Sequence, residues 1–305
     1  MKTHINGTMP GRALTAAIAS LLLLLSSSPS WADNDGPPVN KSQYNLFNPT
    51  PDDAMRGMDT DRPNITNTPH TIDAGHVQVE TGLYDWSHFH DRTHGNDVVT
   101  GALTFGHINA RLGVTDNFEV NATIDSYNRV KSTDKIADQT TRFSGFGDTV
   151  IGGKLNLWGN EGGDEPWTSG FALQPQVKLP TAQTGIGNNH VEWTMDAPFL
   201  INLVGGFHLG IETALGQERN AANSGYVVGW QNSASIDHVI FGAVDVYLEY
   251  AMHVTTEANT QPQQSVNVGF TYPVSDNVEI DSGVFIGTNK ATPGIEWTSG
   301  VSFRF

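Results

Sequence analysis

Apolar and polar residues alternate along the chain in segments of about ten residues, with turn-forming residues between the segments. Residues 244–249, for example, read Val-Asp-Val-Tyr-Leu-Glu. This period of two predicts β-strands that have one apolar and one polar face. We expect about twelve strands, near residues 75–86, 98–113, 118–128, 145–157, 170–180, 192–203, 207–216, 226–236, 240–250, 263–273, 277–287 and 294–305.

A carboxylate-rich polar face beside an apolar face is typical of a barrel in which one face meets lipid and the other meets the lumen. Closure of the sheet also satisfies every backbone group within the membrane. The pattern therefore predicts an all-β fold, a transmembrane antiparallel up-and-down β-barrel that spans residues 74–305. On composition alone, a soluble periplasmic β-protein remains open as the alternative.

Connection lengths predict the orientation of this barrel. Tight turns, such as the one at Asp116 and Asn117, alternate with longer linkers, which we expect at 87–97, 129–144, 181–191, 217–225, 251–262 and 288–293. Short turns belong on the periplasmic side and long loops outside. One linker, 158–169, is long on the side where a short turn is expected. The alternation also changes phase between Leu103 and Ile108, which predicts a bulge.

Both ends of the chain indicate export to the outer membrane of a Gram-negative cell. Residues 1–32 have a basic start, an apolar stretch and small residues before Ala32, which predicts a signal peptide cleaved after Ala32. Residues 33–73 are rich in Pro, Asn and Asp, and we expect an irregular segment at the periplasmic mouth or in the lumen, with a disordered tail as the alternative. The last strand ends on Phe305, which resembles the signal read by the outer-membrane assembly machinery.

Composition narrows the range of partners. The formal net charge is −16, so nucleic acid is not an expected partner. The chain has no cysteine and therefore no disulfide. The expected partners are membrane lipids, lipopolysaccharide, the assembly machinery and a small molecule of unknown identity.

The polar strand face supplies the candidate pathway. If the alternation is right, the lumen is lined by Glu80, Glu119, Asp125, Asp148, Lys154, Gln176, Lys178, Glu212, Asp245, Glu249, Glu279, Asp281, Glu296 and Arg304. Rings of carboxylates favour cations in pores, so one hypothesis is a narrow passage that prefers cations. The alternative is a small barrel whose charges pair across a filled interior and conduct nothing.

Other chemistry has less support in the sequence. His88, His90 and His94 lie in the first outer loop and are candidate zinc or copper ligands, although a solvated loop explains them as well. No cofactor is expected. The chain has no Gly-x-Ser-x-Gly motif and no evident pair of base and nucleophile, so we expect no enzyme activity. Lipid hydrolysis at the membrane interface is the enzymatic alternative.

Short motifs that contain Gly, Asp or Pro lie at 62–66, 74–80, 144–148, 153–155 and 176–181, among them Ser-Gly-Phe-Gly-Asp at 144–148 and Gln-Val-Lys-Leu-Pro-Thr at 176–181. Together they resemble one outer-membrane transporter-like family, labelled "putative MetA-pathway of phenol degradation", over about residues 60–305. The chain departs from the family pattern at Ala182, where glycine usually follows Pro-Thr. The resemblance implies uptake or export of small, often aromatic, molecules across the outer membrane.

The sequence thus predicts an outer-membrane transporter or channel for small molecules, with aromatic or hydrophobic molecules among the candidates. The alternative is a non-conducting structural or surface-interaction barrel whose outer loops carry the function.

Overall fold

The computed structural model describes residues 40–92, 95–163 and 165–305. The signal peptide expected at 1–32 lies outside these residues. No helix in the described part of the chain is long and apolar enough to cross a membrane. The elements are a 3-10 turn, η1 (Asp52–Ala54), and the strands β1 (Val77–Asp91), β2 (Val98–Thr115), β3 (Phe118–Asp134), β4 (Gln139–Gly145), β5 (Thr149–Trp158), β6 (Ser169–Leu179), β7 (Glu192–Asn202), β8 (Phe207–Arg219), β9 (Tyr226–Ile240), β10 (Val244–Thr255), β11 (Gln263–Ser275), β12 (Val278–Gly287) and β13 (Ile295–Arg304).

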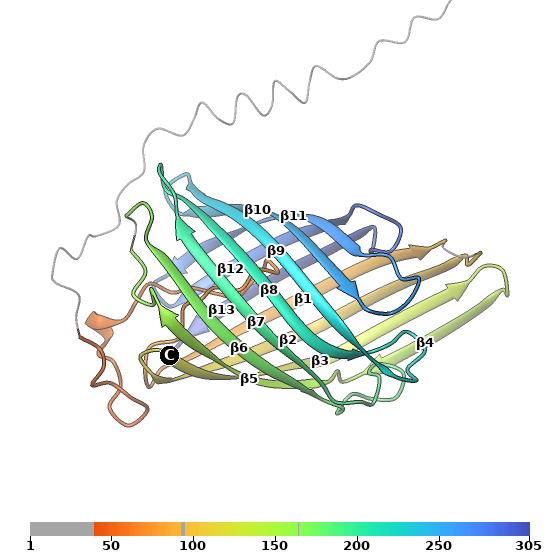
Figure 1. Cartoon of the computed structure of the whole chain (residues 1–305), viewed down its shortest axis with the longest axis horizontal. Helices are drawn as coiled ribbons and strands as arrows, with labels where there is room; N and C mark the ends of the chain where they lie inside the picture. Colours follow the sequence, from red (N-terminus) through yellow and green to blue (C-terminus); the bar gives the residue numbers. More distant parts are fainter. Residues whose placement is uncertain (1–39, 93–94, 164) are drawn as a thin grey trace, which may run out of the picture.

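The strands form one closed antiparallel barrel (Figure 1). Apart from β4 and β5, consecutive strands pair with each other, and β1 pairs with both β2 and β13, so that the sheet closes. β5 pairs with residues 118–124 of β3, and β4 pairs with residues 128–134 of the same strand. β4 and β5 therefore follow one another along a single strand position of the wall. The barrel therefore has twelve strand positions, as the sequence predicted.

The two faces of the wall have opposite chemistry. Leu248 on β10 is 54% exposed, whereas its neighbour Glu249 is 1% exposed. The same alternation places Trp297 outside and Thr298 inside. Buried side chains are mostly polar or charged, and large apolar side chains are mostly on the outside. This arrangement is the reverse of that in a water-soluble protein, and it fits a wall that faces lipid.

The strands are longer than expected at the end that carries the long connections. Residues 129–134 and 139–145 form the outer parts of β3 and β4, so the loop expected at 129–144 is mostly strand. The predicted strand 145–157 is likewise interrupted at 146–148. Polar cross-strand contacts, such as the hydrogen bond between Thr133 and Thr140, extend this hairpin beyond its neighbours (Figure 1).

The change of phase predicted between Leu103 and Ile108 lies at Gly106. Its φ of 65° is accessible to glycine at little cost. Phe105 is exposed on the outer surface, whereas Arg111 farther along β2 is buried. The pairing of β2 with β3 continues in the same register across this point, so the two strands change face together.

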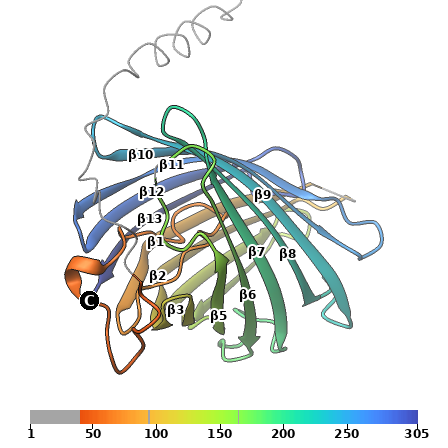
Figure 2. The same ribbon diagram turned by 60° about the vertical axis from the view of Figure 1, so that its left-hand side comes forward.

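Residues 40–76 enter the barrel at the end that carries the short turns and the C-terminal Phe305 (Figure 2). Leu46 donates a backbone hydrogen bond to Val114, and Thr50 donates one to Ala74. Apart from η1 and two isolated bridges at Asn45, this segment has no regular secondary structure. Of the locations considered for residues 33–73, the described part thus occupies both the mouth and the lumen.

The outward face makes a direct test of membrane embedding possible. We expect Leu248→Arg to destabilise the folded barrel by about 2–4 kcal/mol, because a charge would replace an apolar side chain in lipid. Urea unfolding in lipid vesicles measures this difference. Ile136→Arg is the matched control, since Ile136 is exposed in the connection between β3 and β4 and should change the stability little. Equal effects of the two changes would contradict the assignment of the outer face.

Candidate functional site

The most specific feature of the lumen is the chain segment 56–73, which we call the lumen segment. Its two ends are joined by Arg56, whose backbone N–H donates to Asp73 at 2.9 Å and whose guanidinium pairs with the same carboxylate at 3.2 Å. Lys41 also pairs with Asp73, at 3.3 Å. The lumen segment is thus a loop that enters the barrel and returns to the same mouth (Figure 2).

A buried cluster of charges fixes the middle of this loop to the wall. Asp61 on the lumen segment lies 2.8 Å from Lys154 of β5 and 3.3 Å from Arg111 of β2. Arg111 also contacts Glu80 and Glu119, each at 2.8 Å. The side chains of Lys154, Arg111, Glu80 and Glu119 are fully buried. Charges this far from water are tolerated when they are paired and hydrogen-bonded, and here each is.

Wall carboxylates also accept hydrogen bonds from the backbone of the lumen segment. Glu249 accepts from the N–H groups of Ile65 and Thr66, at 3.0 and 2.7 Å. Glu212 accepts from Asn67 at 2.8 Å. Glu119 accepts from Ile72 at 2.8 Å, and Glu80 accepts from Asp61 at 3.2 Å. A segment without secondary structure needs partners for its buried backbone groups, and the wall supplies them.

Wall donors serve the carbonyl groups of the lumen segment in the same way. Gln78 donates to Asp59, Asn156 to Pro69 and Arg111 to His70, at 2.8–3.0 Å. Arg304 of β13 donates to Arg56 at 2.7 Å. The wall therefore satisfies both donors and acceptors of the loop backbone and helps to set its irregular path.

The connection between β5 and β6 explains the long linker predicted on the short-turn side. Asn160 accepts a hydrogen bond from the backbone of Thr71 at 2.9 Å. Glu161 pairs with Lys41 at 2.8 Å and with Arg56 at 3.3 Å. The extra residues of this connection thus contact both ends of the lumen segment, at Arg56 and Thr71, and hold the loop in its seated position in the bore.

Further contacts join the loop to strands on the other side of the barrel. Arg62 pairs with Asp281 at 3.1 Å and donates to Thr298 at 2.6 Å. The hydroxyl of Thr60 donates to Glu279 at 2.8 Å. The lumen segment therefore bridges β2 and β5 to β12 and β13 across the bore.

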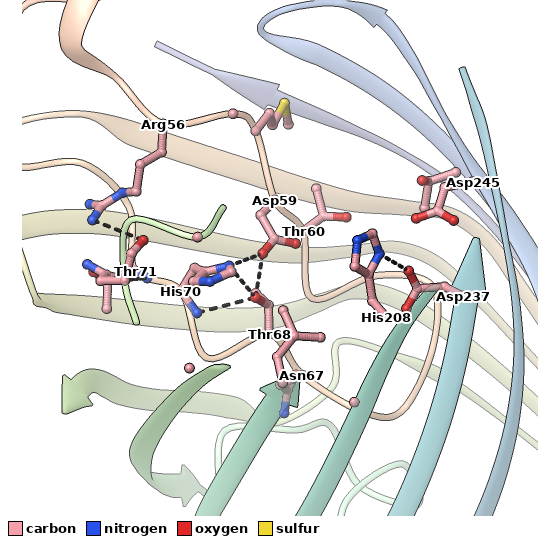
Figure 3. A pocket seen from close by; sticks show the side chains of 18 of the residues that line it. Arg56, Asp59, Thr60, Asn67, Thr68, His70, Thr71, His208, Asp237 and Asp245 are labelled. Carbon is pink, nitrogen blue, oxygen red and sulfur yellow. Dashed lines mark hydrogen bonds and ion pairs between the residues drawn. The ribbon is translucent and has the colours of Figure 1, made fainter. Parts of the chain in front are cut away.

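Two cavities adjoin the lumen segment. The larger, of about 460 Å³, lies toward the short-turn end and is lined by Asp59, His70, His208, Asp237 and Asp245, among others (Figure 3). The smaller, of about 340 Å³, is lined largely by polar side chains, including those of His107, Asn109, Asn121, Gln174 and Gln176. Both cavities are therefore partly walled by the loop and partly by the barrel.

Asp59 carries a fixed negative charge into the larger cavity. Its carboxylate lies 2.6 Å from Nδ1 of His70 and accepts a hydrogen bond from Thr68 (Figure 3). Burial raises the pKa of this carboxyl, but the hydrogen bonds and charge of His70, together with Thr68 and Arg111, outweigh burial and lower the pKa to about 2. The side chain is 41% exposed, which fits a carboxylate that faces a cavity on one side.

The remaining residues of the candidate pathway lie apart from the central cluster. Lys178 pairs with Asp148 at 3.3 Å and with Glu192 at 2.7 Å. Asp125 lies 2.7 Å from His107, and Gln176 donates to Asp196 at 2.6 Å. Asp245 lines the larger cavity. Glu296 is half-buried, and its side chain has neither a hydrogen bond nor an ion pair to the part of the chain that the structure describes.

The histidine-rich loop lies partly outside the described residues, because His94 is not among them. His90 lies 2.7 Å from Asp97, and the ring of His88 is next to Trp86. Among the residues with a described structure, no group of three or more His, Cys, Asp or Glu side chains could hold a metal ion.

Sequence reasoning placed Lys178 and Asp148, which pair with each other, in the lumen, but it missed other residues that pair with the predicted carboxylates. Arg111 was not assigned to the lumen, although it alternates with Ala110 and Leu112 on β2. Asp61 and Arg62 lie in a segment without periodicity, so no pattern could reveal their partners. The phase change at Gly106 also obscured the face of the neighbouring residues.

The fold and the polar, partly filled lumen define an outer-membrane type of β-barrel. The chain belongs to the family described as "Putative MetA-pathway of phenol degradation", whose model matches residues 60–305. The resemblance inferred from the motifs is thereby confirmed. No curated protein matches the chain.

Solved structures show the same fold. The translocator domain of the autotransporter NalP from Neisseria meningitidis is 10% identical, with a TM-score of 0.51 over 75% of this chain and 88% of that chain. The transport unit of the autotransporter AIDA-I from Escherichia coli is 8% identical, with a TM-score of 0.50 over 81% of this chain and 92% of that chain. At these identities the likeness extends to the barrel architecture.

The central charge cluster predicts a strong effect of a single substitution. We expect Lys154→Met to destabilise the seated loop by about 3–5 kcal/mol, because the substitution removes one partner from a buried ion pair. A cysteine placed at Asn64 would be unique in this cysteine-free chain, and its labelling rate reports release of the loop. Addition of Asp61→Asn should recover part of the loss. An unchanged labelling rate in Lys154→Met would contradict this role of the cluster.

Asp59 predicts how loop release depends on pH. Because the pKa in the folded state, about 2, lies below the ordinary value of 3.8, the charged carboxylate stabilises the seated loop. This contribution is complete above about pH 4 and disappears as the pH falls through 2. Hydrogen exchange of residues 56–73 should be faster in Asp59→Asn than in the wild type near neutral pH, with the difference vanishing toward pH 2. A difference that grows on acidification would contradict the assignment.

Proposed function

We propose that the protein is a gated outer-membrane passage for small molecules and that the lumen segment is its gate. The observation that carries this proposal is the way in which the loop is held. Its contacts to the bore are ion pairs between side chains and hydrogen bonds that involve at least one side chain, such as those that the backbone N–H groups of Thr66 and Asn67 donate to wall carboxylates. Water could replace such contacts without breaking any strand pairing, so the loop can leave its seat while the wall stays intact.

The cavities favour polar solutes as cargo. Among the described residues, no Trp, Phe or Tyr lines the smaller cavity. One residue of these three types, Tyr247, lines the larger cavity. The tryptophans Trp158, Trp193, Trp230 and Trp297 are all close to half-exposed on the outer surface. They are suited to interfacial girdles and give no support to an aromatic path through the bore.

We also propose that the protein is not an enzyme. Asp59, His70 and Thr68 have the residue types of a hydrolytic triad, but Asp59 and Thr68 both contact Nδ1 of the same ring. A catalytic histidine uses one ring nitrogen for the carboxylate and the other for the nucleophile. This geometry supports a structural role for the three residues and leaves lipid hydrolysis without a candidate site.

The proposed partners and location follow from the fold. An outer-membrane barrel contacts membrane lipids and, on its outer side, lipopolysaccharide. Phe305 is 73% exposed at the end of the chain that is described, which supports recognition by the assembly machinery. Truncation of this residue should lower the amount of barrel recovered from outer membranes.

A second candidate function is surface interaction without flux. β4 pairs with β3 along one edge, and along its other edge it pairs with no strand of the described chain. An unpaired edge is a template for another strand. This feature supports a role in which the outer hairpin, and not the bore, meets a partner.

A reversible lock tests the gate. The hydroxyls of Thr66 and Ser233 are 2.8 Å apart, which makes these positions suitable for a disulfide between the loop and β9. In the variant Thr66→Cys/Ser233→Cys, we expect uptake of small solutes into liposomes under reducing conditions and its loss on oxidation. Thr66→Cys alone is the matched control and should not respond to oxidation.

Deletion of residues 57–72 provides the complementary measurement. We expect the assembled deletion variant to conduct continuously in planar bilayers, since the bore loses the segment that crosses it. A correctly assembled deletion variant that conducts no more than the wild type would contradict the gate and favour the non-conducting alternative.

A further inference from the structure

The larger cavity is lined by a cluster of four carboxyl groups that the gate does not explain. Asp237 lies on β9, Asp245 on β10 and Glu279 on β12, and together with Asp59 of the lumen segment they line the cavity. Figure 3 shows Asp59, Asp237 and Asp245. In the described ranges of the chain, no lysine or arginine forms an ion pair with any of these four carboxylates. The cationic side chains that line the cavity are Arg56, Arg62 and Arg304.

Each of these arginines is committed elsewhere. Arg56 pairs with Asp73, Asp116 and Glu161. Arg62 pairs with Asp281, on the side of the loop that faces β12.

Arg304 donates to the carbonyl groups of Arg56 and Asp276 and to the side chain of Asn277. The arginines therefore hold the lumen segment in place and form no ion pair with the four carboxylates. Histidines are the remaining basic side chains that line the cavity.

The histidines compensate two of the carboxylates at most. His70 lies 2.6 Å from Asp59, and His208 lies 2.7 Å from Asp237. Glu279 accepts a hydrogen bond from the neutral hydroxyl of Thr60. Oδ1 of Asp245 is buried and has no hydrogen-bond partner. The carboxylates are thus left in excess of the charges around them.

Two buried hydroxyl groups give independent evidence of a missing ligand. Ser235 is 2% exposed and Tyr247 is 5% exposed, and both line the cavity. Neither hydroxyl has a hydrogen-bond partner. Ser235 precedes Asp237 by two residues on β9, and Tyr247 follows Asp245 by two on β10, so all four share the inner face. Buried polar atoms without partners are rare, and these two hydroxyls line the same cavity as Asp245, whose Oδ1 also has no hydrogen-bond partner.

We infer that this cavity binds a small aliphatic ammonium ion between the lumen segment and the wall. An ammonium group has three donors and no acceptor, and carboxylate and hydroxyl oxygens supply the acceptors that it needs. A volume of about 460 Å³ is within the usual range of small-molecule sites. The carboxylates come from four separate elements and surround the space, and no metal-binding group of three is present among the described residues.

Binding would connect the loop to the wall. Asp59 moves with the lumen segment, whereas Asp237, Asp245 and Glu279 belong to strands. A cation held by both sides would therefore favour the seated loop, since its binding requires the two to be close. This inference concerns binding and does not depend on flux through the barrel.

The test uses the full-length barrel in detergent micelles and putrescine as the probe. We expect isothermal titration calorimetry to show one saturable site for putrescine and none for the neutral isostere 1,4-butanediol or for the dianion succinate. Asp245→Asn should weaken putrescine binding about tenfold or more, because a charge-assisted hydrogen bond is lost. Asp138→Asn, the same change at an exposed position in the connection between β3 and β4, should leave binding unchanged.

Tyr247→Phe provides a second variant that keeps all four carboxylates. Tyr247→Phe should weaken putrescine binding by a smaller factor than Asp245→Asn. The variant should keep the heat-dependent shift in gel mobility that shows a folded barrel. Absence of putrescine binding in the wild type would overturn the inference, as would equal binding of 1,4-butanediol or equal affinities of Asp245→Asn and Asp138→Asn. Any of these outcomes leaves the lock and deletion experiments, and hence the proposed gate, untouched.

Discussion

The interior of this barrel can remain charged because the lumen segment complements the charges. Glu80, Arg111, Glu119 and Lys154 are fully buried, and Asp61 from the loop completes their network. Without the loop, these groups would face the bore with fewer partners and would need water to replace them. The same contacts therefore hold the loop in position and supply partners for the charged side chains of the wall.

The same constraint explains why the loop has no secondary structure of its own. Wall carboxylates take its N–H groups, and wall amides and arginines take its carbonyl groups. A helix would have satisfied those groups internally and would have taken the backbone donors away from the carboxylates of Glu212 and Glu249. An extended path presents backbone donors to the wall in succession, and that is what a carboxylate-lined surface requires.

Much of the wall was predictable from the sequence because alternation has a period that no other element shares. It placed Glu249 and Leu248 on opposite faces and predicted strands in all twelve positions of the barrel. It could not place Asp61, because the partners of an irregular segment depend on residues far away in the chain. The outer parts of β3 and β4 were missed for a different reason: residues 129–144 are mostly polar, with few apolar residues such as Val130 and Phe143, and therefore resemble a loop.

The closure between β1 and β13 has a consequence for the order of assembly. Asp61 can meet Arg111 and Lys154 once β2 and β5 exist, whereas Arg62 finds Asp281 and Thr298 after the last strands have been made. Segment 56–73 precedes every strand of the described chain and contacts strands from both ends of the sheet, so it can serve as an internal scaffold for the barrel. Its earliest contacts would then guide the growing sheet, and its last ones would form as the final seam is sealed.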